Sequence, residues 1–158
     1  MADQRFGFGF DAHAYGVGRT LMLAGVRFDD HPGLIGHSDG DAVCHAVADA
    51  ILGAAALGDI GEHFPEEDDR LEGIAGLDLL ARTVAKVRVR GLAAWSTDVT
   101  VIAERPSISP SRDEMRRNLG SALNVPLGRI SIKATRPEGI GLSGEGIGCL
   151  ALVVLSAG

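Results

Sequence analysis

The sequence has no basic tract, and its 158 residues carry a formal net charge of −6. A chain of this charge lacks the electrostatic footprint of nucleic-acid-binding proteins, so we expect no nucleic acid as a partner. No apolar run is long enough to span a bilayer, and residues 1–5 form no apolar leader, so we expect no membrane association and a cytoplasmic location. An anionic small molecule remains compatible with this composition if metals, helix N-termini or a few placed cations supply positive charge.

Cysteine and aromatic residues are also scarce, with two cysteines and 4% aromatics. Cys44 and Cys149 lie in apolar stretches and form no CxxC pair, which is typical of buried, reduced thiols. At 46% hydrophobic and 23% charged residues, the composition is that of an ordinary globular protein. The length suits a single domain over residues 1–158.

Hydrophobic periodicity predicts an α+β domain, with a sheet covered on one face by helices. Alternating patterns predict a hairpin over 20–28, a loop over 29–36, and strands over 5–13, 95–103, 129–134 and 147–155. Helical spacing predicts three helices, which begin at Ser38 or Asp39, near Leu77, and at Ser109. The last strand is almost wholly apolar, so we expect it to be buried on both faces, and hence an oligomer.

The fragment Asp11-Ala12-His13 and the later His45 combine two imidazoles with one carboxylate. Residues two apart on a strand share a face, so Asp11 and His13 point the same way. Two histidines and a carboxylate with an open position suit a catalytic Zn²⁺. From the residues alone, an ordinary surface or core histidine remains an alternative. Asp49, one helical turn after His45, either accepts the second imidazole N–H or forms a simple polar pair.

His37 and Ser38 precede the first predicted helix. Free backbone N–H groups at a helix start favour an anion such as phosphate. Simple capping by Ser38, with Asp41 as in a capping box, is the alternative, and both roles are compatible. In either case Asp41 is a cap rather than a metal ligand.

Three blocks together resemble one enzyme family. They are the Phe10–His13 fragment, the block Gly36-His37-Ser38-Asp39-Gly40-Asp41 with His45, and the run from Leu52 to Gly61 followed by Phe64-Pro65. Over residues 5–155 the chain resembles the 2-C-methyl-D-erythritol 2,4-cyclodiphosphate synthase family of the non-mevalonate isoprenoid pathway.

The resemblance implies a ferredoxin-like α+β subunit in a bacterial, cytoplasmic homotrimer, with active sites between subunits. The implied reaction converts 4-diphosphocytidyl-2-C-methyl-D-erythritol 2-phosphate to the cyclic 2,4-diphosphate plus CMP. The implied metals are one Zn²⁺ per subunit on Asp11, His13 and His45, and a Mg²⁺ or Mn²⁺ on Glu138. The implied catalytic positions are His37 and Arg136.

The substrate-binding positions implied by the resemblance fall into three groups. Around the metal they are Asp11, Ala12, His13, His37 and Ser38. Around the erythritol they are Asp59, Ile60, Gly61, Phe64, Pro65, Glu66, Glu67 and Asp68. Around the cytidine and its phosphates they are Ala103, Glu104, Arg105, Pro106, Ser107, Ile108, Ser109, Thr135, Arg136, Pro137, Glu138 and Leu142.

The sequence departs from the family pattern mainly in its last third. Arg136 stands where the family usually has a second threonine, and Ser107 stands where a lysine usually follows the proline. We therefore hypothesise that Arg136 compensates for the missing lysine charge. The segment 143–146 is two residues shorter than usual and lacks an arginine that meets prenyl diphosphates in relatives, so we expect weak or no prenyl diphosphate binding in a central cavity. Glu66 replaces a common aspartate.

Two other functions compete with an active synthase. One is a non-catalytic metal-binding trimer that has lost the nucleotide half of the site. The other is a different zinc phosphoesterase, which the erythritol-side motifs disfavour.

Overall fold

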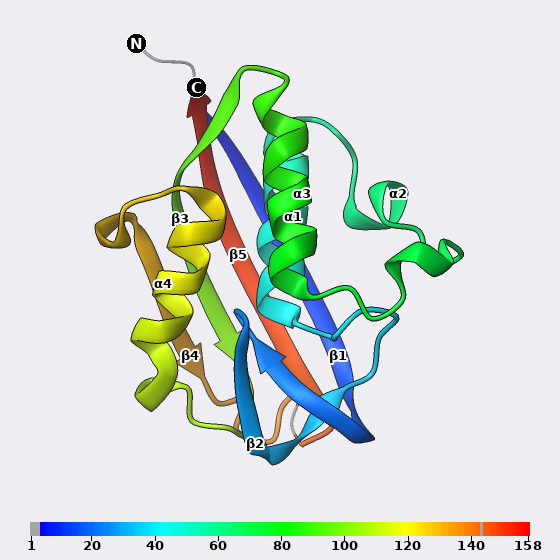
Figure 1. Ribbon diagram of the computed structural model, residues 1–158. Helices are drawn as coiled ribbons and strands as arrows, with labels where there is room; N and C mark the ends of the chain where they lie inside the picture. The colour runs from blue at the N-terminus through cyan, green and yellow to red at the C-terminus, as the bar shows by residue number, and fades with distance from the viewer. Residues whose placement is uncertain (1–3, 143) are drawn as a thin grey trace.

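The computed structural model describes residues 4–142 and 144–158, and it has a five-stranded sheet with helices on one face (Figure 1). The strands are β1 (Gln4–Leu23), β2 (Val26–Leu34), β3 (Leu92–Ile102), β4 (Ile130–Thr135) and β5 (Gly146–Ala157). The helices are α1 (Ala42–Ala54), α2 (Ile60–His63), α3 (Gly76–Arg88) and α4 (Arg112–Leu123), with 3₁₀ turns η1 (Asp69–Leu71), η2 (Ser109–Ser111) and η3 (Leu127–Arg129).

The sheet has the strand order β2-β1-β5-β3-β4. β5 lies at its centre and pairs antiparallel with β1 on one side and β3 on the other. β3 and the edge strand β4 run parallel, so the sheet is mixed. The α+β class and the helix-covered sheet are confirmed, whereas the ferredoxin-like comparison stays a prediction.

Helix α1 lies directly on the sheet, and α3 covers α1 from outside (Figure 1). Because it is enclosed in this way, α1 is buried almost all round, with only Asp49 and Gly53 not fully buried. The polar residues of this helix region, Asp41, His45 and Asp49, accordingly have partners inside the protein.

Glycines on β1 allow α1 to approach the strand closely. A Cβ added to Gly7 would lie 1.8 Å from the Ala50 carbonyl oxygen, and one added to Gly9 would lie 2.0 Å from the Ala46 carbonyl oxygen. Both separations are far below van der Waals contact, so any larger residue would push the helix away. Gly7 and Gly9 alternate with Phe6, Phe8 and Phe10, which point to the other face.

The outer face of the sheet carries exposed apolar side chains. Phe6, Phe8 and Phe10 of β1 are 64%, 65% and 52% exposed, and Leu152 of β5 is 44% exposed. In the single chain the outer face of β5 is only partly covered, with Leu152 exposed, and the oligomer that would bury this face stays a prediction. Contiguous apolar surface of this kind marks an interaction site.

Several local boundaries differ from the sequence prediction, and the first is that the strand predicted over 5–13 continues as β1 to Leu23. The predicted hairpin is present, with its turn at Ala24 and Gly25, but β2 continues to Leu34 through the predicted loop over 29–36. Helix α1 begins at Ala42, because Asp41 and not Ser38 is its N-cap. The third long helix begins at Arg112, after the 3₁₀ turn that starts at Ser109.

The helices found in residues 4–142 and 144–158 are all too short or too polar to cross a bilayer.

Candidate metal centre and substrate pocket

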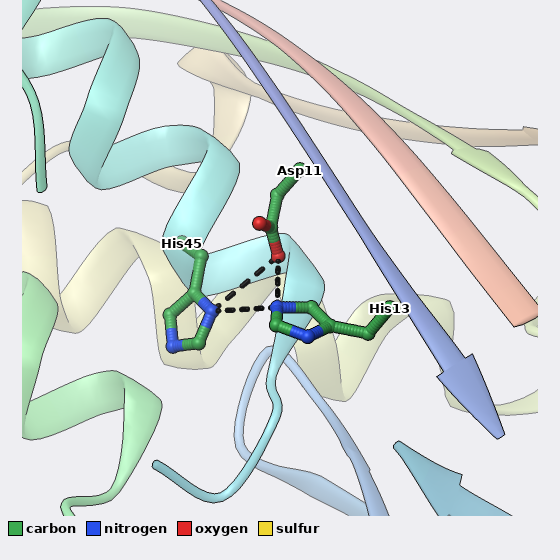
Figure 2. Close-up of side chains that lie close together, drawn as sticks. All are labelled: Asp11, His13 and His45. Carbon is green, nitrogen blue, oxygen red and sulfur yellow. Dashed lines mark hydrogen bonds and ion pairs between the residues drawn. The ribbon is translucent and has the colours of Figure 1, made fainter. Parts of the chain in front are cut away.

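A candidate metal site lies between β1 and α1 (Figure 2). The side chains of Asp11 and His13 on β1 and of His45 on α1 point toward one another there. Asp11 Oδ2 lies 2.8 Å from His13 Nε2 and 3.4 Å from His45 Nδ1. The two imidazole nitrogens lie 3.3 Å apart. The three atoms all fall within 4.8 Å of one another, which is the arrangement of a three-ligand metal site.

The fold explains this convergence. Asp11 and His13 continue the face of β1 that Gly9 begins, and this face meets α1. His45 lies in the first turn of α1, next to Ala46, whose carbonyl packs over Gly9. The close contact between strand and helix therefore brings His45 to the strand pair.

The backbone fixes the tautomer of His13. His13 Nδ1 lies 2.6 Å from the Ile35 carbonyl oxygen, which can only accept a hydrogen bond. Nδ1 therefore carries the hydrogen in the neutral ring, and the lone pair of Nε2 faces Asp11 and His45.

A serine contacts the second imidazole, and a hydroxyl can either donate to that ring or accept from it. His45 Nε2 lies 3.0 Å from Ser38 Oγ, which also accepts the Gly40 backbone N–H at 3.1 Å. We assign the Nε2 hydrogen to this contact, which leaves the Nδ1 lone pair free for a metal. The proposed bond between His45 and Asp49 is absent, because Asp49 Oδ1 accepts the Ile60 backbone N–H at 3.2 Å.

The carboxylate completes an electron-rich set. Burial raises the pKa of Asp11, but the two imidazoles outweigh burial and lower that pKa to about 2, so this carboxyl is an anion at neutral pH. Asp11 Oδ2 is buried and has no hydrogen-bond partner of good geometry in the described chain. A buried carboxylate oxygen this close to two imidazole nitrogens is stabilised either by protons on the rings or, with both rings neutral, by a bound divalent cation in their place.

These three residues line a cavity of about 200 Å³. Its walls are Asp11, His13, His37, Ser38, His45, Ile60, Gly61, Phe64, Glu66, Leu71, Ile74 and Leu79. His37 Nε2 is buried and has no partner within the described residues, so it is available to a ligand. The Ser38 hydroxyl, which was predicted to contact phosphate, holds the His45 ring.

Part of the predicted erythritol group lines this cavity, namely Ile60, Gly61, Phe64 and Glu66. Four other members of that group, Asp59, Pro65, Glu67 and Asp68, are absent from its walls. Asp59 caps α2 by accepting the Glu62 N–H, and Asp68 caps η1 and pairs with Arg70. Ala12 is exposed on β1.

Sequence reasoning missed three apolar wall residues, Leu71, Ile74 and Leu79. Leu71 and Leu79 are buried parts of η1 and α3, and no motif distinguishes them from ordinary core residues. Only the three-dimensional path of residues 71–79 past His37 reveals them: Gly73 N–H donates to the His37 carbonyl at 2.9 Å.

The predicted cytidine-side residues lie in two loops that contact each other. The Ala103 backbone N–H donates to the Thr135 carbonyl at 3.1 Å, and Gly139 N–H donates to Glu104 Oε1 at 3.3 Å. The Tyr15 hydroxyl donates to the Arg105 carbonyl at 2.6 Å. No residue of 103–109 or 135–142 lines the metal cavity of the described chain. One chain thus keeps the two predicted half-sites apart, and the roles of these residues stay predictions.

The second predicted metal ligand, Glu138, is exposed and joins no three-residue cluster of carboxylates, imidazoles or thiols in residues 4–142 and 144–158. Arg136 and Ser107 are also exposed, so their predicted compensation is untested. Of the shortened segment 143–146, Ser143 lies outside the described residues, while the Glu145 carbonyl accepts the Tyr15 N–H at 3.0 Å.

Comparison with known proteins adds independent information. The model of the YgbB family matches residues 4–156. The 2-C-methyl-D-erythritol 2,4-cyclodiphosphate synthase of Gloeobacter violaceus is 46% identical over 155 residues, covering 97% of this chain and 95% of that protein. The Bifunctional enzyme IspD/IspF of Anaeromyxobacter sp. is 47% identical over 148 residues, which are 94% of this chain.

Solved structures agree with these matches. A 2C-methyl-D-erythritol-2,4-cyclodiphosphate synthase with CDP bound has a TM-score of 0.88 at 34% identity, over 96% of this chain and 99% of that one. The bifunctional IspDF of Campylobacter jejuni has a TM-score of 0.93 at 39% identity and covers 100% of this chain. The chain spans only 38% and 43% of the two bifunctional relatives. Near-complete matches to single-function relatives establish the relationship: the chain belongs to the YgbB family and is an enzyme of the 2-C-methyl-D-erythritol 2,4-cyclodiphosphate synthase type.

Proposed function

We propose that this chain converts 4-diphosphocytidyl-2-C-methyl-D-erythritol 2-phosphate to the cyclic 2,4-diphosphate and CMP. The observation that carries this proposal is the Asp11, His13 and His45 cluster in the wall of a small, part-apolar cavity. A metal site beside apolar walls suits a phosphate-bearing substrate with a short carbon skeleton. The CDP bound to solved relatives supports a cytidine-linked diphosphate substrate, from which CMP leaves.

Zinc is the metal that best fits the donor set. Two neutral imidazoles and one carboxylate make a three-ligand zinc site that leaves one position for a substrate oxygen. When bound, Zn²⁺ would supply Lewis-acid polarisation and charge neutralisation at the substrate's diphosphate. A second ion, Mg²⁺ or Mn²⁺, would be held by Glu138 when the substrate is present.

The chain's own residues orient the reacting groups. Phosphoryl transfer depends on positioning and charge stabilisation, and needs no covalent nucleophile. His37, whose Nε2 has no partner in the described chain, would hold a phosphate oxygen beside the metal cluster. The walls from Ile60 to Leu79 would hold the methylerythritol carbons and exclude water from the phosphorus centre.

We propose that the working form is a homotrimer with active sites between subunits. Two features support it: the exposed phenylalanine face of β1, and the separation of the metal cavity from the 103–109 and 135–142 loops. A neighbouring subunit would bring its nucleotide loops, with Arg136, to the metal cavity of the first. Light scattering of the purified protein tests the assembly, since a monomer would leave both features unexplained.

A product assay tests the proposed reaction. The purified protein is given the cytidine-linked substrate with Mg²⁺, and CMP and the cyclic diphosphate are measured together. We expect equal amounts of both products. CMP without the cyclic product would identify a zinc phosphoesterase instead.

A non-catalytic metal-binding trimer is the second candidate, and Ser107 and Arg136 on the nucleotide loops are the observations that favour it. It predicts neither product in the assay but one bound zinc per chain.

The two buried, free cysteines are compatible with the reducing bacterial cytoplasm, where we expect the enzyme to work.

A further inference from the structure

A bulge on β1 points toward a function that no motif indicated. Gly16 pairs with Gly33 and Thr20 pairs with Pro32, so three residues of β1, 17–19, have no partner on β2. Bulges next to active sites commonly redirect a side chain. Here the residue at the end of the bulge is Arg19.

Two glycines make this bulge feasible. Gly18 has a φ of 78°, a backbone conformation that favours glycine. A Cβ on Gly33 would lie 2.6 Å from the backbone carbon and oxygen of Arg19, so only glycine lets β2 pass this close. The local sequence therefore supports a specific placement of Arg19.

The bulge brings Arg19 to the metal cavity. Its Nη2 donates to the Ser38 carbonyl at 2.6 Å, and Ser38 lines the cavity and holds His45. In the described chain the guanidinium makes only this one hydrogen bond and is exposed, so its other N–H groups can reach a ligand.

The cavity itself needs this charge. Its described walls contain two carboxylates, Asp11 and Glu66, and no lysine or arginine. The proposed substrate carries a diphosphate and a further phosphate, all anionic. A guanidinium at the rim, anchored on one side by a backbone carbonyl, can offer its remaining N–H donors to phosphate oxygens in a fixed orientation.

We propose that Arg19 is a substrate-binding residue that holds a phosphate group of the ligand at the metal cavity. This assignment rests on the proposed function for the identity of the substrate. Its anchor on Ser38 gives Arg19 a fixed position before substrate arrives, which lowers the entropic cost of binding.

Calorimetric titration of the zinc-loaded protein with CDP tests this assignment. We expect Arg19→Gln to weaken CDP binding by about tenfold, the loss typical of one hydrogen bond to a charged group. Arg19→Lys should recover part of the loss, since it keeps the charge but not the planar fork. Arg27→Gln is the matched control, because Arg27 lies on the same hairpin and pairs with Asp29 at the surface. It should bind CDP within about twofold of the original protein.

Zinc content, measured on the same samples, separates binding from positioning. We expect Arg19→Gln to keep the zinc stoichiometry of the original protein. CDP affinity unchanged by Arg19→Gln, or no CDP binding by the original protein, would overturn the proposal. Loss of zinc from Arg19→Gln would also overturn it, because Arg19 would then act by holding Ser38 and His45 in place. The original protein could also form no product from the substrate while Arg19→Gln still weakens CDP binding. That result would reject the proposed reaction but keep Arg19 as a phosphate contact.

Discussion

Gly9 of β1 lies directly beneath Ala46 of α1, so closely that a Cβ on Gly9 would come within 2.0 Å of the Ala46 carbonyl oxygen. His45 is the neighbour of Ala46, and Asp11 follows Gly9 on the same face of the strand. The spacing between strand and helix thus sets the spacing of the metal ligands.

Gly9→Ala should destabilise the protein by about 3 kcal/mol, because the new methyl must displace the backbone of α1. It should also lower zinc affinity, since His45 moves with the helix. Denaturant unfolding of the metal-free protein measures the first effect, and chelator competition measures the second.

Gly53→Ala is the matched control for this substitution. Gly53 lies in α1, the helix that packs on Gly9, and is exposed. A Cβ added to Gly53 would meet nothing within 4 Å. Alanine there should stabilise the helix by about 0.5–1 kcal/mol. Equal stability of the two variants would show that the close contact does not set the helix position.

Ser38→Ala should weaken zinc binding by about 10- to 100-fold while leaving all three ligands in place. The reason is that Ser38 Oγ contacts His45 Nε2 at 3.0 Å and, in the assigned tautomer, accepts its hydrogen and leaves the Nδ1 lone pair toward Asp11 and His13. Zinc competition with a chromophoric chelator measures the effect. Ser121→Ala, at an exposed serine of α4, is the control. A zinc affinity within twofold of the original for Ser38→Ala would refute this role.

Asp41→Asn should cost about 3 kcal/mol of folding free energy. Asp41 is fully buried, and its carboxylate accepts backbone N–H groups from Cys44 at 3.0 Å, Ala24 at 2.9 Å and Gly25 at 2.7 Å. The side-chain NH₂ of the substituted asparagine would point its own N–H toward one of these backbone N–H groups, so two donors would face each other. Asp113→Asn, at a surface residue that pairs with Arg116, should change stability by less than about 0.5 kcal/mol. Similar unfolding midpoints for both variants would contradict the anchoring role of Asp41.

These residues also explain how far the sequence predicts the structure. Alternation around Phe6, Phe8 and Phe10 sufficed for β1, and the spacing of Asp11 and His13 sufficed for their shared face. The start of α1 was predicted too early, because Asp41 gains its capping position partly from the tertiary bonds to Ala24 and Gly25. Local sequence does not encode those partners.

The site was predictable where one element carries the pattern and less so where two elements meet. Asp49 was expected to support His45 by helical spacing, but Ser38 from the preceding loop takes that place. Arg19 was not predicted, because its role depends on a bulge whose register is visible only after β1 and β2 have paired.

The two thiols should give the stability a pH dependence. Burial is the main factor that raises the pKa of both Cys44 and Cys149 above that of a free thiol, so the folded state holds their protons more tightly. The free energy of unfolding should therefore be unaffected by the thiols below about pH 8.5 and fall above it, by about 2.7 kcal/mol per pH unit for the pair.

Unfolding curves between pH 7 and pH 10 measure this slope, with the double variant Cys44→Ala/Cys149→Ala as the control that lacks it. Native protein should also fail to react with a thiol reagent until denaturant is added. Rapid labelling of the native protein, or identical slopes with and without the cysteines, would be inconsistent with buried protonated thiols.

The most direct test of metal-dependent cyclisation is product formation by chelator-stripped protein, before and after one equivalent of zinc per chain is added with Mg²⁺ and substrate present. The Asp11, His13 and His45 site predicts no product before zinc, and CMP and cyclic diphosphate in equal amounts after it. Equal rates before and after zinc, or no cyclic product at any metal concentration, would contradict it.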